Sequence, residues 1–392
     1  MTFKSGRNFL HTPGPTHIPE RVLRAMLQPA VDFTDPNFLE LTQSCFADLK
    51  KVFKTDSVVI CFASNGHGAW EAALVNTLSP GDRVLVPESG HFTQNWAEMA
   101  ESFGIVIDSA PGDWRHAIDP DAIETALRED KGHEIKAILT VHTDTATGIT
   151  SDLAAIGRAI ERAGHPALYM VDTVAALGTT EFRMDDWGID VAVGGSQKGL
   201  MQPPGLAFNA VSAKALAATE TAELPRLYWD WNRRMEEAYY RWFCGTPPEH
   251  LLFALREGLD MVLEEGLENA FERHRRLAEA VRTAVAVWSR ANALSLNAVV
   301  PEERSNSVTT ILVAEGYEAD TLRMVSRERF DVALGSGLGK TRGKAFRIGH
   351  MGYLNEPMIL GALAGVEAAL EACDIPHEKG GVDAALRYLA AG

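Results

Sequence analysis

The sequence predicts an α/β protein with a large domain built on a mostly parallel sheet that helices cover on both faces, followed by a smaller α+β domain. Short apolar runs alternate with segments of helical periodicity from residue 55 to 212, the pattern of a parallel sheet with crossover helices. Beyond Gly266 this alternation gives way to sparser strands and longer helices. We therefore expect an N-terminal arm over residues 1–18, a large domain over 19–265 and a small domain over 266–392.

Composition narrows the class of partner. The 37 lysines and arginines against 53 acidic residues leave a formal charge of −16, which argues against nucleic acid or an anionic membrane as a partner. The four cysteines have no CxxC spacing, so we expect neither a metal site nor a disulfide framework. The start of the chain has no apolar signal segment and no run reaches membrane-spanning length. We expect a cytoplasmic protein that acts on small molecules.

The first elements predict an arm and an anion site. Residues 11–19 hold three prolines and a glycine, so this segment should be extended and stiff. Helical periodicity then follows over 19–26 and 38–53. A strand over 58–62 runs into Asn65, Gly66 and His67 before a helix over 69–76, and a helix N-terminus after a strand suits a phosphate. The alternative is that Asn65 only caps the helix. The loop is neither a Walker motif nor GxGxxG.

The following strands end in polar or aromatic residues. We expect strands over 83–87, 104–107, 137–141, 167–171, 189–193 and 206–211, with helices over 96–103, 119–127 and 153–162. Asp172 ends a buried strand and should have a cationic partner, because a bare buried carboxylate is costly; capping of the next turn is the alternative. Phe92 follows a strand at the rim where open α/β sheets bind ligands, although ordinary core packing would also place it there.

Lys198 is the residue around which the site is expected to form. It ends the segment Gly194-Gly195-Ser196-Gln197-Lys198 after a buried strand, and the turn Gln202-Pro203-Pro204-Gly205 follows. A strand and a rigid turn would hold the amine in place. A fixed amine suits Schiff-base chemistry when part of its population is neutral; the alternative is a solvated surface lysine.

The second half of the chain adds an aromatic segment and an arginine. Residues 227–248 are dense in aromatic side chains and arginines, which indicates either an interface or a pocket wall. Long helices are expected over 251–264 and 268–288, then strands over 307–313 and 344–349 and helices over 318–327 and 358–372. Arg347 lies between apolar neighbours and suits bidentate binding of a carboxylate, with an internal salt bridge as the alternative.

Taken together, these segments resemble the class V branch of the fold type I pyridoxal-phosphate (PLP) enzymes, most closely the serine-glyoxylate and alanine-glyoxylate aminotransferases. Four segments in the same order carry the resemblance: 12–16, 71–76, 194–198 with 203–205, and 347–349. The sequence also departs from the family. The tyrosine usually found before the Thr246-Pro247 element is absent, Asp144 stands where relatives often have glutamate, and His17 where asparagine is frequent.

The resemblance implies a role for each site residue. Lys198 would hold pyridoxal 5'-phosphate through an imine and then carry the proton at the substrate carbon, while Asp172 would pair with the ring nitrogen. Phe92 would stack on the ring and Thr145 would lie near its hydroxyl. The remaining implied contacts are Asn65, Gly66, His67 and Gln197 around the phosphate, Thr246 from the second subunit of a homodimer, and Arg347 with the backbone of Gly14 at the substrate carboxylate.

The function that the resemblance implies is transfer of an amino group to glyoxylate by a ping-pong route through pyridoxamine phosphate. Serine is the family's common donor, but Arg233 and Arg234 would place a cation near a second carboxylate and so favour aspartate. Two alternatives remain open at this stage. One is a lyase or cysteine desulfurase of the same branch, for which Cys244 is the candidate thiol. The other is a non-catalytic binding protein on the same fold.

Overall fold

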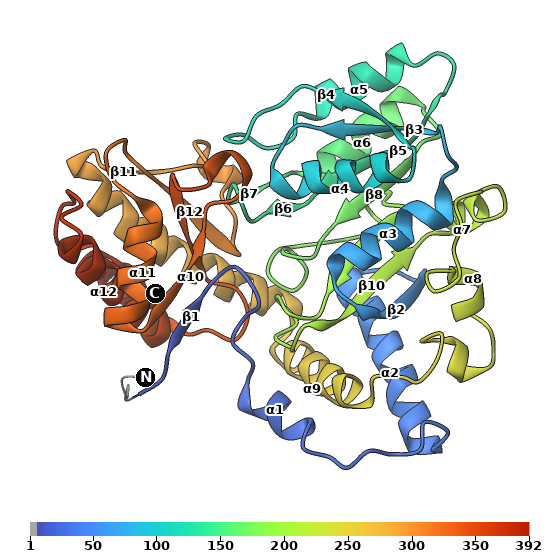
Figure 1. The fold of residues 1–392 in the computed structure, drawn as a ribbon, viewed down its shortest axis with the longest axis horizontal. Helices are drawn as coiled ribbons and strands as arrows, with labels where there is room; N and C mark the ends of the chain where they lie inside the picture. The colour runs from blue at the N-terminus through green and yellow to red at the C-terminus, as the bar shows by residue number, and fades with distance from the viewer. Residues whose placement is uncertain (1–5, 392) are drawn as a thin grey trace.

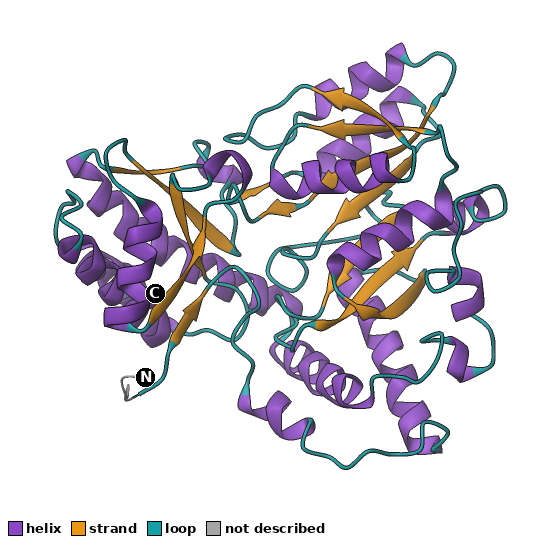
Figure 2. Cartoon of the chain, in the orientation of Figure 1, coloured by secondary structure: helices purple, strands orange, loops and turns teal. Residues whose placement is uncertain are grey.

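The computed structural model describes residues 6–391, so residues 1–5 of the predicted arm lie outside the described part. The chain forms two α/β bodies (Figures 1 and 2), each with its own sheet and helices. None of the described helices is long and apolar enough to cross a membrane.

The large body is built on a seven-stranded sheet in the order β2-β10-β9-β8-β5-β3-β4. β10 pairs antiparallel with both β2 and β9, whereas β9, β8, β5, β3 and β4 pair in parallel. The mostly parallel sheet expected from the sequence is therefore confirmed. The strands are β2 (Val58–Ser64), β3 (Arg83–Pro87), β4 (Val106–Ala110), β5 (Ile135–Val141), β8 (Leu168–Asp172), β9 (Val191–Gly195) and β10 (Gly205–Val211).

Helices cover both faces of this sheet because its strands are apolar on both sides. In β8, Leu168 and Met170 join one hydrophobic cluster and Tyr169 and Val171 join the other, as the alternation of a pleated strand requires. The first cluster takes in α3 (Gly66–Thr77), α4 (His91–Ser102) and α7 (Ala213–Ala218). The second takes in α2 (Pro36–Phe53), α5 (Pro120–Glu129), α6 (Leu153–Ala163) and α9 (Glu249–Glu265).

The small body has a five-stranded sheet in the order β1-β13-β14-β12-β11. Its strands are β1 (Phe9–His11), β11 (Leu294–Leu296), β12 (Val308–Val313), β13 (Val332–Ser336) and β14 (Ala345–Gly349). Its hydrophobic cluster takes in α10 (Leu267–Trp288), α11 (Ala319–Phe330), α12 (Glu356–Ala372) and α13 (Gly381–Ala390). Figure 1 shows β1, in dark blue, beside the orange strands of this body.

The strands β1 and β13 and the start of α4 differ from the sequence-based elements. The expected arm contributes β1, which pairs in parallel with β13 and so joins the two ends of the chain in one sheet. α4 begins at His91 rather than near Trp96, so Phe92 lies in the first turn of a helix. α9 ends and α10 begins on either side of Gly266, where we place the boundary between the two domains as a proposal.

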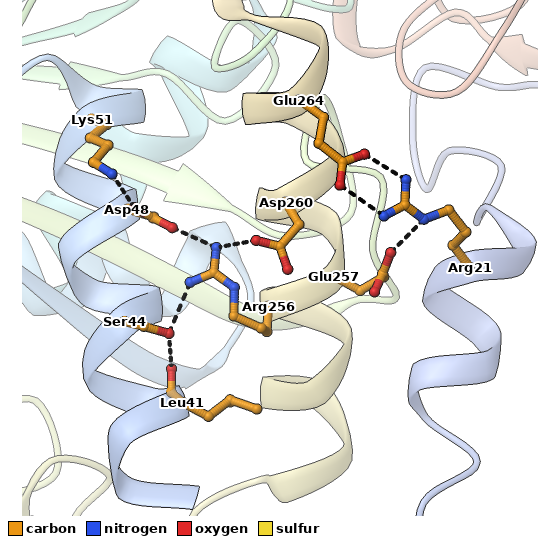
Figure 3. Close-up of polar contacts among 9 residues, drawn as sticks. All are labelled: Arg21, Leu41, Ser44, Asp48, Lys51, Arg256, Glu257, Asp260 and Glu264. Atoms are coloured by element: carbon orange, nitrogen blue, oxygen red, sulfur yellow. Dashed lines mark hydrogen bonds and ion pairs between the residues drawn. The ribbon is translucent and has the colours of Figure 1, made fainter. Parts of the chain in front are cut away.

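Helices α1 (Glu20–Ala25), α2 and α9 are joined by ion pairs (Figure 3). The Arg256 guanidinium contacts Asp48 at 2.5 Å and Asp260 at 2.9 Å, with a side chain only 15% exposed. Arg21 of α1 reaches Glu257 and Glu264 of α9 at 2.6 and 2.7 Å. Arg21 is half exposed, so solvent screens its ion pairs, which join α1 to α9 but add little stability.

Four histidines are exposed by 3% or less: His11, His142, His274 and His350. Burial lowers the pKa of all four, to about 4 for His11 and to about 3 for His142 and His274. These four buried histidines are therefore neutral in the folded protein at physiological pH, whereas an unfolded chain would protonate them near pH 6.5.

Candidate active site

The polar residues at the carboxyl ends of the central strands surround a cavity of about 180 Å³. Parallel strands bring their carboxyl ends to one edge of the sheet, where α/β proteins bind ligands. Twelve residues line the cavity: Asn65, Gly66, His67, Trp70, Phe92, Thr143, Thr145, Asp172, Val174, Ala175, Gln197 and Lys198. Eight of the nine predicted cofactor contacts are thus gathered in one place, and only Thr246 is not among them.

Lys198 follows β9 in the connection to β10 and is held on the arm side of the cavity. Its Nζ donates a hydrogen bond to the carbonyl of Pro13. Burial, reinforced by the nearby Arg347 cation, lowers the pKa of the amine to about 8, although Asp172 opposes this shift. Gly14 has φ +99°, and a Cβ there would overlap the Lys198 side chain, so only glycine fits this close approach. An amine that is partly neutral near pH 8 can attack a carbonyl.

Asp172 ends β8 and lies beside Val193 of β9. Its Oδ1 accepts from the Val174 amide at 2.6 Å and its Oδ2 from the indole Nε1 of Trp70 at 3.0 Å. Burial raises the pKa of the carboxyl to about 7, and these two hydrogen bonds oppose the rise. Within residues 6–391 both hydrogen-bond donors are neutral, and the Lys198 amine interacts with the carboxylate through its charge, so a hydrogen-bonded cationic partner stays a prediction.

The N-terminus of α3 faces the cavity, and Asn65 caps it. The Asn65 Oδ1 accepts from the amides of His67 and Gly68 at 3.1 and 3.4 Å, so the capping alternative describes part of what this side chain does. Burial lowers the pKa of the half-buried His67. The Gln197 Oε1 is buried without a partner among the described residues. Because the two ends of an amide are nearly equal in shape, this group can offer either a donor or an acceptor to a ligand.

Phe92 and Thr145 are positioned by Asp144 and Arg347. The Asp144 Oδ2 accepts from the Phe92 amide and its Oδ1 from the Ala146 amide, both at 2.8 Å. Burial raises the pKa of Asp144 to about 6. Arg347 donates through Nη1 to the Thr145 carbonyl at 2.9 Å and through Nε to the carbonyl of Ser336 at 2.6 Å. Its Nη2 makes no hydrogen bond within residues 6–391, and this nitrogen is therefore available to an anion.

Five predicted contacts are not among the residues that line this cavity: Gly14 and Arg347, whose contacts are described above, and Thr246, Arg233 and Arg234. Thr246 is exposed on the segment before α9. Arg233 has a side chain 45% exposed and lies 3.9 Å from Asp230. Arg234 is 4% exposed, and its guanidinium donates to the carbonyls of Tyr228 and Trp242, so its donors serve the fold of its own segment.

The aromatic segment is partly packed and partly exposed. Trp229 donates to Glu71 of α3 at 3.0 Å and Trp231 to Asn209 of β10 at 3.1 Å, which holds this stretch against the large body. Leu227, Met235 and Tyr240 are exposed by 59%, 38% and 48%. No residue of 227–248 lines the cavity around Lys198, so the pocket-wall alternative has no support there, and the interface alternative stays a prediction.

A larger cavity of about 450 Å³ lies between α9, α10 and the start of α12. Its charged residues are already paired with one another, Arg21 with Glu264 and Arg273 with Glu265. It contains no lysine or histidine among its lining residues. This larger cavity therefore offers no unpaired reactive side chain among its lining residues. We take the smaller cavity around Lys198 as the candidate active site.

Four lining residues were not singled out from the sequence: Trp70, Thr143, Val174 and Ala175. Of these, Trp70 donates a side-chain hydrogen bond to Asp172. No local pattern distinguishes a functional tryptophan on an apolar helix from a core one. Its spacing of three residues from His67 on the same helix is the one signal that would have placed it at the cavity. Within residues 6–391 no cluster of three or more histidine, cysteine or acidic side chains is arranged to hold a metal ion.

The residues present fit pyridoxal 5'-phosphate. A partly neutral lysine, a buried carboxylate, an aromatic ring and a helix N-terminus surround one cavity, and the buried amide oxygen of Gln197 has no partner in the part of the chain that the structure describes. With the two-body fold, these features define a PLP enzyme of fold type I. The chain belongs to the class-V aminotransferase family, whose model matches residues 8–346, and enzymes of this family use PLP.

Named relatives cover nearly the whole chain. A serine-glyoxylate aminotransferase of Methylorubrum extorquens is 45% identical over 99% of this chain and 97% of its own length. An L-aspartate-glyoxylate aminotransferase of Paracoccus denitrificans is 44% identical over 98% of this chain and 96% of its own. The crystal structure of the ureidoglycine-glyoxylate aminotransferase of Bacillus subtilis matches with a TM-score of 0.90 at 30% identity, covering 100% of both chains.

Proposed function

We propose that this aminotransferase moves the amino group of a small amino acid to glyoxylate, using pyridoxal 5'-phosphate in a ping-pong reaction. The observation that carries the proposal is that Lys198 and Asp172 line one buried cavity in a class-V chain. Glyoxylate is the acceptor named for the relatives at 45% and 44% identity, and this supports the same acceptor here.

Bound PLP supplies an aldehyde that captures the substrate amine and a ring that withdraws electrons from the substrate carbon. Lys198 is the base and acid of the site, because its buried amine exchanges a proton near neutral pH. Asp172 presents negative charge to a basic group of the cofactor. We propose that the free Nη2 of Arg347, with the backbone of Gly14, binds the carboxylate that both substrates carry.

The remaining predicted contacts are proposed for the cofactor. Asn65, Gly66, His67 and Gln197 would surround the phosphate, because they lie at the N-terminal end of α3 or beside it on the cavity, and a helix N-terminus favours an anion. Phe92 would cover one face of the ring and Thr145 would lie near its hydroxyl. All six residues line the same cavity as Lys198, which supports this assignment.

We propose serine as the amino donor, with aspartate as the second candidate. The names of the two relatives support each donor about equally. Arg233 favours aspartate, since its guanidinium is partly exposed on the segment that leads to Thr246. Arg234 supports it less, because its donors already bind main-chain carbonyls.

We propose a homodimer with shared active sites. Thr246 lies outside the cavity of its own chain and is exposed, and the same segment exposes Leu227, Met235 and Tyr240. A second subunit would cover these side chains and bring Thr246 to the partner's phosphate. Light scattering should give twice the chain mass of 42.7 kDa; a monomer that is fully active would contradict this arrangement.

One set of activity assays with different amino acids and glyoxylate tests both the amino donor and the acceptor. The purified protein should carry a yellow cofactor and should convert glyoxylate to glycine with serine or aspartate, measured as kcat/KM for serine, aspartate and alanine. Lys198→Ala should lower the rate at least about 100-fold, the lower range for loss of a general acid-base. A colourless protein, or a variant with the wild-type rate, would refute the proposal. Arg233→Ala should lower kcat/KM for aspartate only.

The alternatives from the sequence lose support. Cys244 does not line the cavity, so within the described chain no thiol is placed to act as the nucleophile of a desulfurase. A purely non-catalytic role does not fit membership of an aminotransferase family. We keep the cytoplasmic location as a proposal, supported by four free cysteines, a pattern usual in reducing compartments; fractionation of the source cells would test it.

A further inference from the structure

The one side chain that donates a hydrogen bond to Asp172, within residues 6–391, is Trp70. Its Nε1 lies 3.0 Å from the Asp172 Oδ2, and the indole is 1% exposed. The other oxygen of the carboxylate is bound by a backbone amide, that of Val174. A neutral donor that binds a carboxylate stabilises its ionised form, and in a buried site this effect is larger than in water.

The indole of Trp70 is held in this orientation by its neighbours. The ring stacks on Trp96 with centroids 5.6 Å apart and planes at 13°. On other sides it contacts the ring of His67 at 4.5 Å and the edge of Phe92 at 6.4 Å. Trp70 also lines the cavity itself. Because the ring cannot turn without displacing this stack, its N–H is directed at Asp172 before any ligand binds.

We propose that Trp70 is a positioning residue for the cofactor, whose indole N–H keeps Asp172 ionised and oriented for the ring nitrogen. This inference rests on the proposed PLP-dependent function and deepens it. A carboxylate that burial alone would leave largely protonated near neutral pH cannot hold a cation. Trp70 therefore acts through Asp172, and its ring contacts with Phe92 and His67 connect Asp172 to the residues proposed for the ring face and the phosphate.

Trp96 provides a matched control. It lies in the same stack, is fully buried, and its Nε1 has no hydrogen-bond partner among the described residues. Trp96→Phe therefore removes a similar part of the stack without touching Asp172, whereas Trp70→Phe also removes the hydrogen bond. A difference between the two variants isolates the contribution of the indole N–H to Asp172.

The experiment measures PLP affinity of the apo-proteins by equilibrium dialysis, the pKa of the Asp172 carboxyl by carbon-13 NMR, and the pH profile of kcat/KM. Trp70→Phe should weaken PLP binding about tenfold or more and raise the carboxyl pKa by about one unit, the size expected for one hydrogen bond to a charged group. Trp96→Phe should change PLP affinity less than about threefold, as expected for a change that leaves that bond intact.

A double-variant cycle tests whether Trp70 acts through Asp172. Asp172→Asn removes the carboxylate, so adding Trp70→Phe to it should leave PLP affinity unchanged within about twofold, since no charged hydrogen bond remains to be lost. Equal losses in Trp70→Phe and Trp96→Phe, or a full further loss in the double variant, would overturn the inference. If the wild-type protein does not bind PLP, the proposed function itself is refuted.

If Trp70→Phe does not fold, the tryptophan can be left in place. Indole nitrogen-15 labelling of the eight tryptophans gives one proton resonance for each ring N–H. In the apo-protein, Asp172→Asn should move one of these resonances to higher field, because a hydrogen bond to a carboxylate is shorter and stronger than one to an amide. A spectrum with no displaced indole resonance would overturn the inference.

Discussion

Replacing Arg347 by lysine separates the charge of this side chain from its shape. Arg347 uses Nε for the Ser336 carbonyl and Nη1 for Thr145, and its Nη2 side remains for the substrate carboxylate. A lysine keeps one positive charge but has no planar fork. It can satisfy the buried carbonyls or the substrate, but not both in the same geometry.

The size of the effect follows from the bonds lost. One hydrogen bond to a charged group contributes about 1.5–3 kcal/mol, and about 1.4 kcal/mol corresponds to a tenfold change. Arg347→Lys should therefore lower kcat/KM by about 10- to 100-fold. Both the amino donor and glyoxylate carry a carboxylate next to the reacting carbon, so both half-reactions should fall by a similar factor.

The two half-reactions are measured separately, the first with the amino donor alone and the second with glyoxylate alone. Arg323→Lys is the control, since Arg323 is a nearby cation that donates to Leu334 and Asp320 and, unlike Arg347, makes no hydrogen bond to the cavity residue Thr145 within the described chain. It should change either rate less than about threefold, as expected for a site that makes no substrate hydrogen bond. A loss confined to one half-reaction, or an equal loss in the control, would refute the assignment.

Asp144→Ala should speed hydrogen exchange of the Phe92 amide by about tenfold or more, because the amide loses a charged acceptor; unchanged exchange in the peptide around residue 92 would contradict this. Reconstitution of the apo-protein with PLP should become faster with rising pH and level off above about 8, since burial lowers the Lys198 pKa to that value; a rate that is flat from pH 6 to 9 would exclude a titrating amine. The apo-protein should lose stability as pH falls from about 6 to 5, because an unfolded chain protonates histidine near pH 6.5 and the four buried histidines do not. Two carboxyls with raised pKa, Asp144 and Asp172, take up protons in the folded state and oppose this loss, so the free energy of unfolding should fall by about 2–3 kcal/mol per pH unit. A melting temperature that rises as the pH falls from 6 to 5 would contradict the sign.

The elements that the sequence predicted well are those whose signal is local. The apolar runs at 58–62, 83–87, 137–141 and 206–211 correspond to β2, β3, β5 and β10. β13 was missed because Val332–Ser336 is short and ends in Gly335 and Ser336, which weakens the strand pattern. β1 was missed because three residues beside a proline-rich segment have no strand signal of their own, and their pairing with β13 is a long-range contact.

The start of α4 shows why one helix boundary could not be predicted. The cap residue is Gly90, which has no side-chain acceptor, and the hydroxyl of the neighbouring Ser89 bonds to the Thr93 hydroxyl rather than to a backbone amide of the first turn. The acceptor comes instead from Asp144, whose carboxylate receives the Phe92 amide from a segment far along the chain. The helix therefore begins about one turn earlier than its local pattern indicates, and this places Phe92 on the cavity wall.

The site residues also divide into those with a local sequence signal and those placed by long-range contacts. Lys198 and Asp172 could be recognised because a lysine after a buried strand and an aspartate at a strand end are unusual in charge and position. Trp70 could not, since a tryptophan on an alanine-rich helix has the pattern of a core residue, and only the three-dimensional approach of β8 to α3 brings a carboxylate to its N–H. Thr246 remains a prediction, because its proposed contact belongs to a second chain.

One physical cause, burial, acts in opposite directions on the two reactive groups. It lowers the pKa of the Lys198 amine and raises that of the Asp172 carboxyl, so each group is moved toward its neutral form. A ligand that bonds covalently to the amine and presents a basic nitrogen to the carboxylate would relieve both costs at once. An aldehyde on a nitrogen-containing ring meets both requirements. The Trp70 hydrogen bond stabilises the ionised Asp172 carboxylate as well, so its charge does not depend on the ligand alone. The burial that stabilises the sheet therefore also shifts the pKa values of Lys198 and Asp172 in the direction that favours binding of such a cofactor.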